Sequence, residues 1–135
     1  MEMSKALTIS AFGMEAQTAR LQVIAENLAN QNTTGSTPGA AAYRRKTVTF
    51  ANEMDRAAGT NVVKVKEIGV DKSDLPLRYD PGHPAADANG YVRTPNVNSF
   101  LEVMDMREAQ GSYNANLAVM QVTRGMLSST IAMLK

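Results

Sequence analysis

The residues best suited to chemistry in this 135-residue chain lie around its single histidine, His83. His83 stands between Asp80 and Asp87, and imidazole and carboxylate groups are common ligands of a divalent metal ion. The same imidazole could serve as the general base of a hydrolase. One histidine between two prolines, in a chain without a second histidine or any cysteine, is more typical of an ordinary loop residue. The sequence therefore predicts no metal site and no cofactor, and we expect no enzyme.

Two pairs of carboxylates are the next candidates for acid–base chemistry. Asp71 and Asp74 fit a solvated loop, whereas Glu102 and Asp105 fit the first turn of a helix, where acidic side chains interact favourably with the helix dipole. The hydroxyl run 128–130 has no general base in view. No glycine-rich phosphate loop of either standard spacing is present. We expect no small-molecule substrate.

Charge and hydropathy exclude further classes. The net charge is only +1, and the basic run 44–46 favours a strand-edge or inter-subunit contact over nucleic-acid binding. No apolar run approaches the roughly 18–20 residues of a membrane span, so no direct membrane insertion is expected. Residues 1–5 lack the basic region and following apolar stretch of a cleavable signal peptide, which leaves export by another machine open.

The first long element expected is an amphipathic helix over residues 1–32. Its apolar residues recur at intervals of seven, with small residues four positions after the first three of them, which predicts a seam that a partner helix approaches closely. The apolar members are Leu7, Met14, Leu21 and Leu28, and the small members are Ala11, Thr18 and Ala25. A loop rich in Gly, Ser and Pro should follow over 33–43.

Residues 98–134 give the strongest periodic pattern and predict a second long helix. Its seam alternates in steps of three and four, with Gln110 and Arg124 as polar interruptions. The apolar and aromatic seam residues are Val103, Met106, Tyr113, Leu117, Met120, Leu127, Ile131 and Leu134. A second stripe (Val119, Val122, Met126 and Met133) occupies a neighbouring face, and one partner helix cannot cover both.

Between the helices, residues 44–97 carry most of the charge. Strands are expected at 46–50 and 62–70, and the proline-containing stretch 71–97 should be irregular and extended. We therefore expect a mainly α fold with a small β part, in three segments: 1–35, 36–97 and 98–135. The two terminal helices would pair as an antiparallel coiled coil around a β-containing, Pro-rich insert. The second stripe would remain for contacts with other molecules, which indicates an assembly subunit.

Three ordered motifs resemble those of the bacterial flagellar rod and hook protein family, and the middle motif resembles its proximal-rod branch. The first is Asn27, Leu28, Ala29, Asn30, Asn32 and Thr33 with the later Tyr43 and Arg44, and the last is Tyr113, Ala115 and Asn116. The middle motif is Asp80, Pro81, His83, Pro84, Asp87, Asn89, Gly90, Tyr91, Pro95, Asn96 and Asn98.

This resemblance implies a structural subunit of the basal-body rod, a helical assembly that crosses the periplasm and transmits torque from motor to hook. It implies export by the flagellar type III apparatus without a cleaved signal peptide. The implied partners are copies of the chain, other rod proteins, and basal-body ring and export-gate-adjacent components. The seam residues of both terminal helices would then form subunit interfaces.

The asparagines of the motifs also have a direct physical interpretation. Asn27, Asn30 and Asn32 lie where the first helix should end, and Asn tolerates the left-handed conformation and caps free backbone groups. We expect them, with Asn114 and Asn116, to fix the helix end and the register between subunits. A small type III-exported coiled-coil partner forming discrete oligomers, and a hydrolase using His83, remain alternatives from the residues alone.

Overall fold

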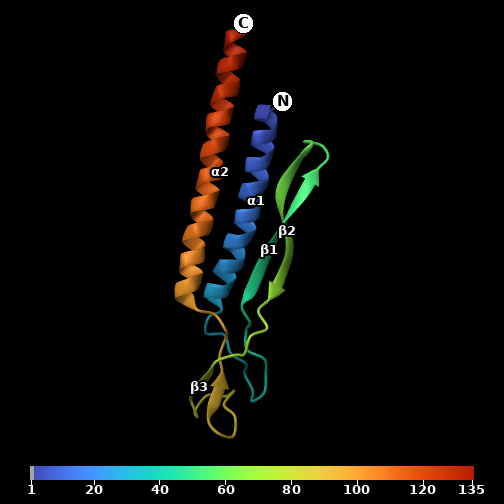
Figure 1. Cartoon of the computed structure of the whole chain (residues 1–135). Coiled ribbons are helices and arrows are strands. Elements are labelled where there is room, and N and C mark those ends of the chain that lie inside the picture. Colours follow the sequence, from blue (N-terminus) through green and yellow to red (C-terminus); the bar gives the residue numbers. More distant parts are fainter. Residues whose placement is uncertain (1) are drawn as a thin grey trace. The chain divides into compact units, whose positions relative to one another are not determined.

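The computed structural model describes residues 2–135. It contains two long helices and four strands: α1 (Glu2–Ala29), β1 (Lys46–Asp55), β2 (Thr60–Val70), β3 (Leu77–Tyr79), β4 (Tyr91–Arg93) and α2 (Ser99–Met133) (Figure 1). The expected mainly α fold with a small β part is confirmed. Two differences concern the middle. β1 continues to Asp55 rather than ending at residue 50, and the stretch 71–97 contains the short strands β3 and β4.

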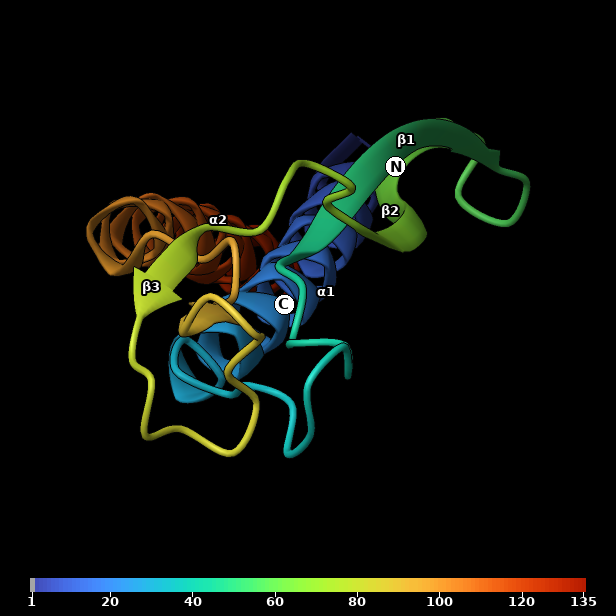
Figure 2. The ribbon, with the colours of Figure 1, turned by 90° about the horizontal axis from the view of Figure 1, so that it is seen from below.

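The chain forms two compact units, and each helix contributes to both. The first unit comprises the chain as far as Leu21, Val48–Glu67 and Met106–Lys135, and the second comprises Gln22–Thr47 and Ile68–Asp105. In the first unit α1 has α2 on one side and the β1–β2 hairpin on the other, a layering visible in Figures 1 and 2.

The two helices run antiparallel within the first unit. Arg20 of α1 forms an ion pair with Glu108 of α2 (3.2 Å), and Gly13, about two turns earlier on α1, lies against Asn116, about two turns later on α2. A Cβ at Gly13 would come within 2.8 Å of the Asn116 Nδ2, so only glycine leaves room for this amide. The helices therefore approach closely where a small residue faces a polar one.

Several buried positions of both helices lie one residue before the predicted seams, although Ala16 and Val23 of α1 lie two residues before them. Ser10, Ile24 and Asn27 are buried, whereas Ala11 and Ala25 are exposed. On α2 the buried positions are Glu102, Ala109 and Thr123, each directly before a seam residue (Val103, Gln110 and Arg124) that is exposed. One residue corresponds to about 100° around a helix. Pairing of the two seams as a coiled coil within the chain is therefore not confirmed, since small and polar residues such as Ser10, Ala109 and Thr123 share the inner face.

The hairpin β1–β2 contacts α1 through a cation and an aromatic ring in the first unit. Strands joined by so short a turn must be antiparallel, and this turn is closed by the Gly59 N–H donating to the Asp55 carbonyl (2.8 Å). The Lys64 ammonium lies 5.4 Å from the centre of the Phe12 ring and 3.4 Å from a Glu53 carboxylate oxygen. Lys64 thus connects the strand to the helix by a cation–π contact.

In the second unit, β3 and β4 form a separate two-stranded antiparallel sheet. Leu77 is opposite Arg93, Arg78 is opposite Val92 and Tyr79 is opposite Tyr91. One face carries the fully buried Val92, and the other carries the exposed edge-to-face pair Tyr79–Tyr91. This small sheet was not predicted, because strands of three residues are too short for an alternation to be recognised.

Candidate functional site

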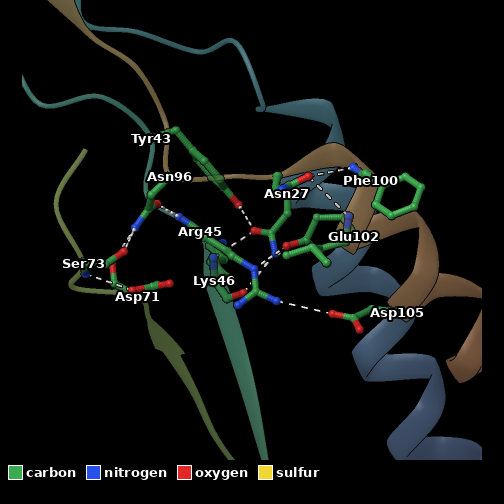
Figure 3. A network of polar contacts seen from close by, with 12 residues as sticks. Asn27, Tyr43, Arg45, Lys46, Asp71, Ser73, Asn96, Phe100, Glu102 and Asp105 are labelled. Atoms are coloured by element: carbon green, nitrogen blue, oxygen red, sulfur yellow. Dashed lines mark hydrogen bonds and ion pairs between the residues drawn. The ribbon is translucent and has the colours of Figure 1, made fainter. Parts of the chain in front are cut away.

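A polar network in the second unit joins the end of α1, the start of β1 and the start of α2 (Figure 3). Asn27 stands at its centre and is almost completely buried (1 % exposed). Its Oδ1 accepts hydrogen bonds from the Lys46 backbone N–H (2.8 Å) and the Tyr43 hydroxyl (2.7 Å). Its Nδ2 donates to the Lys46 carbonyl (2.9 Å) and to Glu102 Oε2 (3.4 Å). The side-chain amide therefore pairs with Lys46 as a neighbouring strand would, and fixes the helix to β1.

Burial raises the pKa of the Tyr43 hydroxyl above its ordinary value. Desolvation disfavours the charged phenolate, so the hydroxyl keeps its proton and remains the donor to Asn27. Asn27 and Tyr43 both belong to the first family motif, but the sequence analysis predicted no contact between them. The structure brings these two motif residues together.

Glu102 is the buried charge of the network. Its side chain is fully buried in the first turn of α2, and its Oε1 accepts a hydrogen bond from Arg45 Nε. Arg45 Nη2 also reaches Asp105 Oδ2 at 3.4 Å. The hydrogen bond to Glu102 raises the pKa of the Arg45 guanidinium, so the guanidinium stays ionised. A buried carboxylate requires such a partner, because leaving it alone costs several kcal/mol.

A second group of contacts ties β1 to the segment after β2. The Asn96 side chain accepts from the Arg45 backbone N–H (2.7 Å) and donates to the Asp71 carbonyl and Ser73 Oγ (both 3.1 Å). The Arg44 guanidinium donates to the Ser73 carbonyl (2.8 Å). The Ser73 N–H donates to the Asp71 carboxylate and lowers the pKa of that group below its ordinary value. This contribution to stability is present at neutral pH and is lost as the pH falls from the ordinary Asp range through the lowered pKa.

The end of α1 is capped by Asn30. Its Nδ2 donates to the Glu26 carbonyl (2.9 Å), and its Oδ1 accepts from the Thr33 hydroxyl (3.1 Å). The expected capping role of Asn30 is therefore observed, but no non-glycine residue among 2–135 has a positive φ, so the expected left-handed Asn does not occur. Asn32 is exposed. At the start of α2, Asn98 Oδ1 accepts from the Phe100 N–H (3.1 Å) as an N-cap.

The middle motif from Asp80 to Gly90 forms the turn between β3 and β4, whereas its last members lie after β4. Asp87 Oδ1 accepts from the N–H groups of Asn89 and Tyr91, both at 2.9 Å. Gly90 has a φ of +84°, and a Cβ there would lie 2.9 Å from Tyr79 Cε2. The motif thus shapes a turn that places Tyr91 against Tyr79.

Gly90→Ala is expected to destabilise the protein by about 1–3 kcal/mol, because the left-handed conformation and the contact with Tyr79 both oppose a side chain. The midpoint of urea unfolding, followed by circular dichroism, measures this. Gly39→Ala is the matched control: Gly39 has a similar φ of +82°, but a Cβ there meets nothing within 4 Å. Equal losses in both variants would show that the contact with Tyr79 contributes nothing.

The predicted interface residues lie outside this network. Most of the apolar seam residues are half-buried, while Val103, Ile131 and Leu134 are exposed. Of the last motif, Tyr113 and Asn116 are half-buried and Ala115 is exposed. The second stripe on α2 is exposed at Val119, Val122, Met126 and Met133.

Two key residues of the network were not predicted as such. Arg45 was placed in a basic run and Glu102 in a helix first turn, without a link between them. The sequence does not indicate that an arginine beside a strand and an acid in the first turn of a helix, 57 positions apart, lie close in space. Only the resemblance indicated that the surroundings of Tyr43 and Arg44 matter.

The contacts of the polar network are hydrogen bonds and ion pairs that hold the chain segments together. Among residues 2–135 no group of three or more His, Asp or Glu side chains is arranged to hold a metal ion. Within the same residues, neither helix combines the length and apolar character needed to span a bilayer. The arrangement is that of a structural protein whose helix ends are fixed by hydrogen bonds and ion pairs.

Comparison with known proteins agrees with that class. Residues 7–37 match the family described as "Flagella basal body rod protein", and residues 88–133 match "Flagellar basal body rod FlgEFG protein C-terminal". The chain is 53 % identical over 133 residues to the flagellar basal-body rod protein FlgC of Agrobacterium fabrum, covering 98 % of this chain and 96 % of the relative. It is 39 % identical to FlgC of Salmonella typhimurium (93 % and 92 % covered) and 35 % identical to FlgC of Borreliella burgdorferi (100 % and 99 %).

The chain belongs to the flagellar basal-body rod protein family and is a FlgC-like member of it. It is a structural subunit of the flagellar basal-body rod. The expectation from the sequence motifs is confirmed. The match to the first family model includes Asn27, Asn30 and the loop after α1 as far as residue 37. The match to the second includes Gly90 and all of α2.

Proposed function

We propose that the subunit assembles helically with copies of itself and with other rod proteins, and that the assembly transmits torque from motor to hook. The terminal segments 1–35 and 98–135 form its core contacts, and the segment 36–97 bridges adjacent subunits. The supporting observation is the rotation of the seams away from the inner face. Seam residues such as Leu21 and Leu117 remain only half-buried within one chain.

Exposed apolar side chains along α2 support the same proposal. Val122 is 63 % exposed and Met133 is 86 % exposed, and from Ser128 onward every residue of the chain is exposed. A protein that presents such a row of apolar side chains gains free energy by covering it with other molecules. The seams would pair with helices of neighbouring subunits in coiled-coil fashion, and the second stripe would add lateral contacts.

We infer the remaining context from the family. The rod subunit is exported by the flagellar type III apparatus without a cleaved signal peptide and becomes part of a rod that spans the periplasm. Basal-body ring and export-gate-adjacent components are its further neighbours. Its role is mechanical, and torque resistance results from many modest contacts over a large shared surface.

Leu117→Asp and Leu21→Asp are expected to abolish rod assembly and motility, because an unpaired carboxylate at a covered interface costs several kcal/mol. The test expresses each variant as the sole copy in a flagellated bacterium and records swimming and isolated basal bodies. Ser128→Asp is the control, because Ser128 is an exposed α2 residue outside both stripes.

Circular dichroism of each purified variant separates loss of assembly from loss of folding. Normal swimming of both Leu variants would contradict the seam assignment. Discrete oligomers of fixed size from the wild-type chain, without incorporation into rods, would favour the alternative of a small exported coiled-coil partner.

A further inference from the structure

Asn89 and Gly90 form the single Asn–Gly pair of the sequence, in the turn between β3 and β4. The Asn89 side chain is exposed, and its amide group forms no hydrogen bond within residues 2–135. An asparagine followed by glycine is chemically labile, because no side chain on the second residue hinders attack of its backbone nitrogen on the asparagine amide. The pair is therefore a candidate modification site.

The reaction of such a pair is deamidation, and its only co-reactant is water. The backbone nitrogen of Gly90 attacks the side-chain carbonyl carbon Cγ of Asn89, and a C–N bond forms. The Gly90 N–H proton passes through water to the side-chain nitrogen, which leaves as ammonia. Water then adds to either carbonyl of the cyclic imide and opens it. The product is aspartate, or isoaspartate if the chain continues through the former side-chain carbonyl.

The turn holds the Gly90 nitrogen away from this reaction. Its N–H donates to the Asp87 carbonyl (3.0 Å). The Asp87 carboxylate Oδ1 accepts from the N–H groups on either side, those of Asn89 and Tyr91 (both 2.9 Å). The Gly90 nitrogen can approach Asn89 Cγ only by rotation about the Asn89 Cα–C bond, which moves the N–H away from Asp87. The turn must therefore open before the imide can form.

The fold also requires the residue that makes the pair labile. Gly90 is buried with a φ of +84°, and a Cβ there would lie 2.9 Å from Tyr79 Cε2. A side chain at position 90 would slow the attack, but it would strain the turn. Suppression of the reaction in this chain therefore has to come from the turn itself.

We propose that Asn89 is a deamidation site that is reactive in the unfolded chain and protected by the turn between β3 and β4. The amide is lost while the turn is open and retained while it is closed. Isoaspartate would add one carbon to the backbone between positions 89 and 90. The Gly90 N–H would then no longer align with the Asp87 carbonyl, so the modified chain could not close the turn again.

Mass spectrometry of the purified full chain tests the proposal, because cleavage after Arg78 and Arg93 releases a peptide in which Asn89 is the single asparagine. The chain is incubated at mildly alkaline pH, either folded in buffer or unfolded in concentrated urea. Formation of aspartate and isoaspartate is followed over time. Deamidation is expected to be at least about tenfold slower in the folded chain, the order of effect that arises when a hydrogen bond must open first.

The variant Asp87→Ala separates the turn from the chemistry. It removes the carboxylate that accepts from Asn89 and Tyr91 but leaves the Asn–Gly pair unchanged, so deamidation of the folded chain should rise about five- to tenfold. Asp80→Ala is the matched control, because it removes a carboxylate of the same loop that contacts Arg78 instead, at 3.6 Å. Its rate should stay within about twofold of the wild-type rate.

Two results would overturn the proposal. One is equal deamidation of the folded and the unfolded wild-type chain. The other is an Asp87→Ala chain that keeps its helices by circular dichroism and still deamidates as slowly as the wild type. The first comparison needs no variant, so it decides the proposal even if Asp87→Ala does not fold. Neither result bears on assembly through the helices, since Leu21 and Leu117 lie on other elements.

Discussion

Arg45→Met is expected to lower the free energy of unfolding by about 3–5 kcal/mol, because it leaves the carboxylate of Glu102 buried without its counter-charge. Glu102 is fully buried, and Arg45 Nε is the cationic donor to its Oε1. Urea unfolding at pH 7, followed by circular dichroism, measures this loss.

Two further variants make this result specific. Arg44→Met removes the adjacent guanidinium, which donates to the carbonyls of Asp71 and Ser73, and should cost about 1 kcal/mol. The double variant Arg45→Met/Glu102→Leu should recover most of the lost stability, since a buried ion pair can be replaced by apolar groups at little cost. A double variant no more stable than Arg45→Met would show that the unpaired charge is not the cause.

Asn27→Ala is expected to cost about 2–4 kcal/mol and to uncouple the end of α1 from β1. The change leaves the Lys46 N–H and carbonyl and the Tyr43 hydroxyl without their partner, and unsatisfied buried polar groups cost about 1–3 kcal/mol each. Hydrogen exchange should rise at residues 25–30 and 45–48. Because we expect Asn27 to fix the register between subunits, we also expect a bacterium that carries this variant as the sole copy of the gene to lose motility.

Controls for Asn27 come from the same motif. Asn32→Ala, at an exposed position, should change stability by less than about 0.5 kcal/mol. Asn30→Ala should cost about 1 kcal/mol, the usual loss for a helix cap. Asn27→Asp keeps the oxygen that accepts from Lys46 but puts a carboxylate beside Glu102, so it should be no more stable than Asn27→Ala. Full helix continuity through residue 34 and normal assembly in both Ala variants at positions 27 and 30 would refute the role of these asparagines.

The helices could be predicted from the sequence because their periodicity extends over many turns. The predicted 98–134 differs from α2 by one residue at each end, and the predicted 1–32 overruns Ala29 by three. The inner face could not be predicted from the same pattern. The spacing of apolar residues identifies side chains that are expected to be buried. Gly13 and Asn116 face each other for a different reason: the absence of a side chain at Gly13 leaves space for the Asn116 amide. A hydropathy pattern contains no information on such a fit.

The site was predictable only in part. The family motif identified Asn27, Tyr43 and Asn96, and the physical interpretation of Asn30 as a cap was correct. Glu102 was interpreted as an acid in the first turn of a helix, and its burial was not predicted because sequence position alone says nothing about burial. Its partner Arg45 lies 57 positions away, and such long-range pairing depends on how β1 crosses the helix ends. The short sheet β3–β4 escaped notice for the same reason, since its pairing depends on the turn at Gly90.

The sequence separation of the partners in the polar network sets an order of events for folding. Asn27 pairs with Glu102 across 75 positions, so its hydrogen-bonding groups cannot all be satisfied until about three quarters of the chain is available. Closing so long a loop is entropically costly and slow compared with forming either helix. The three hydrogen bonds of Asn27 with Tyr43 and Lys46 span at most 19 positions and can form earlier. The contacts with Glu102 on α2 therefore complete the polar network last.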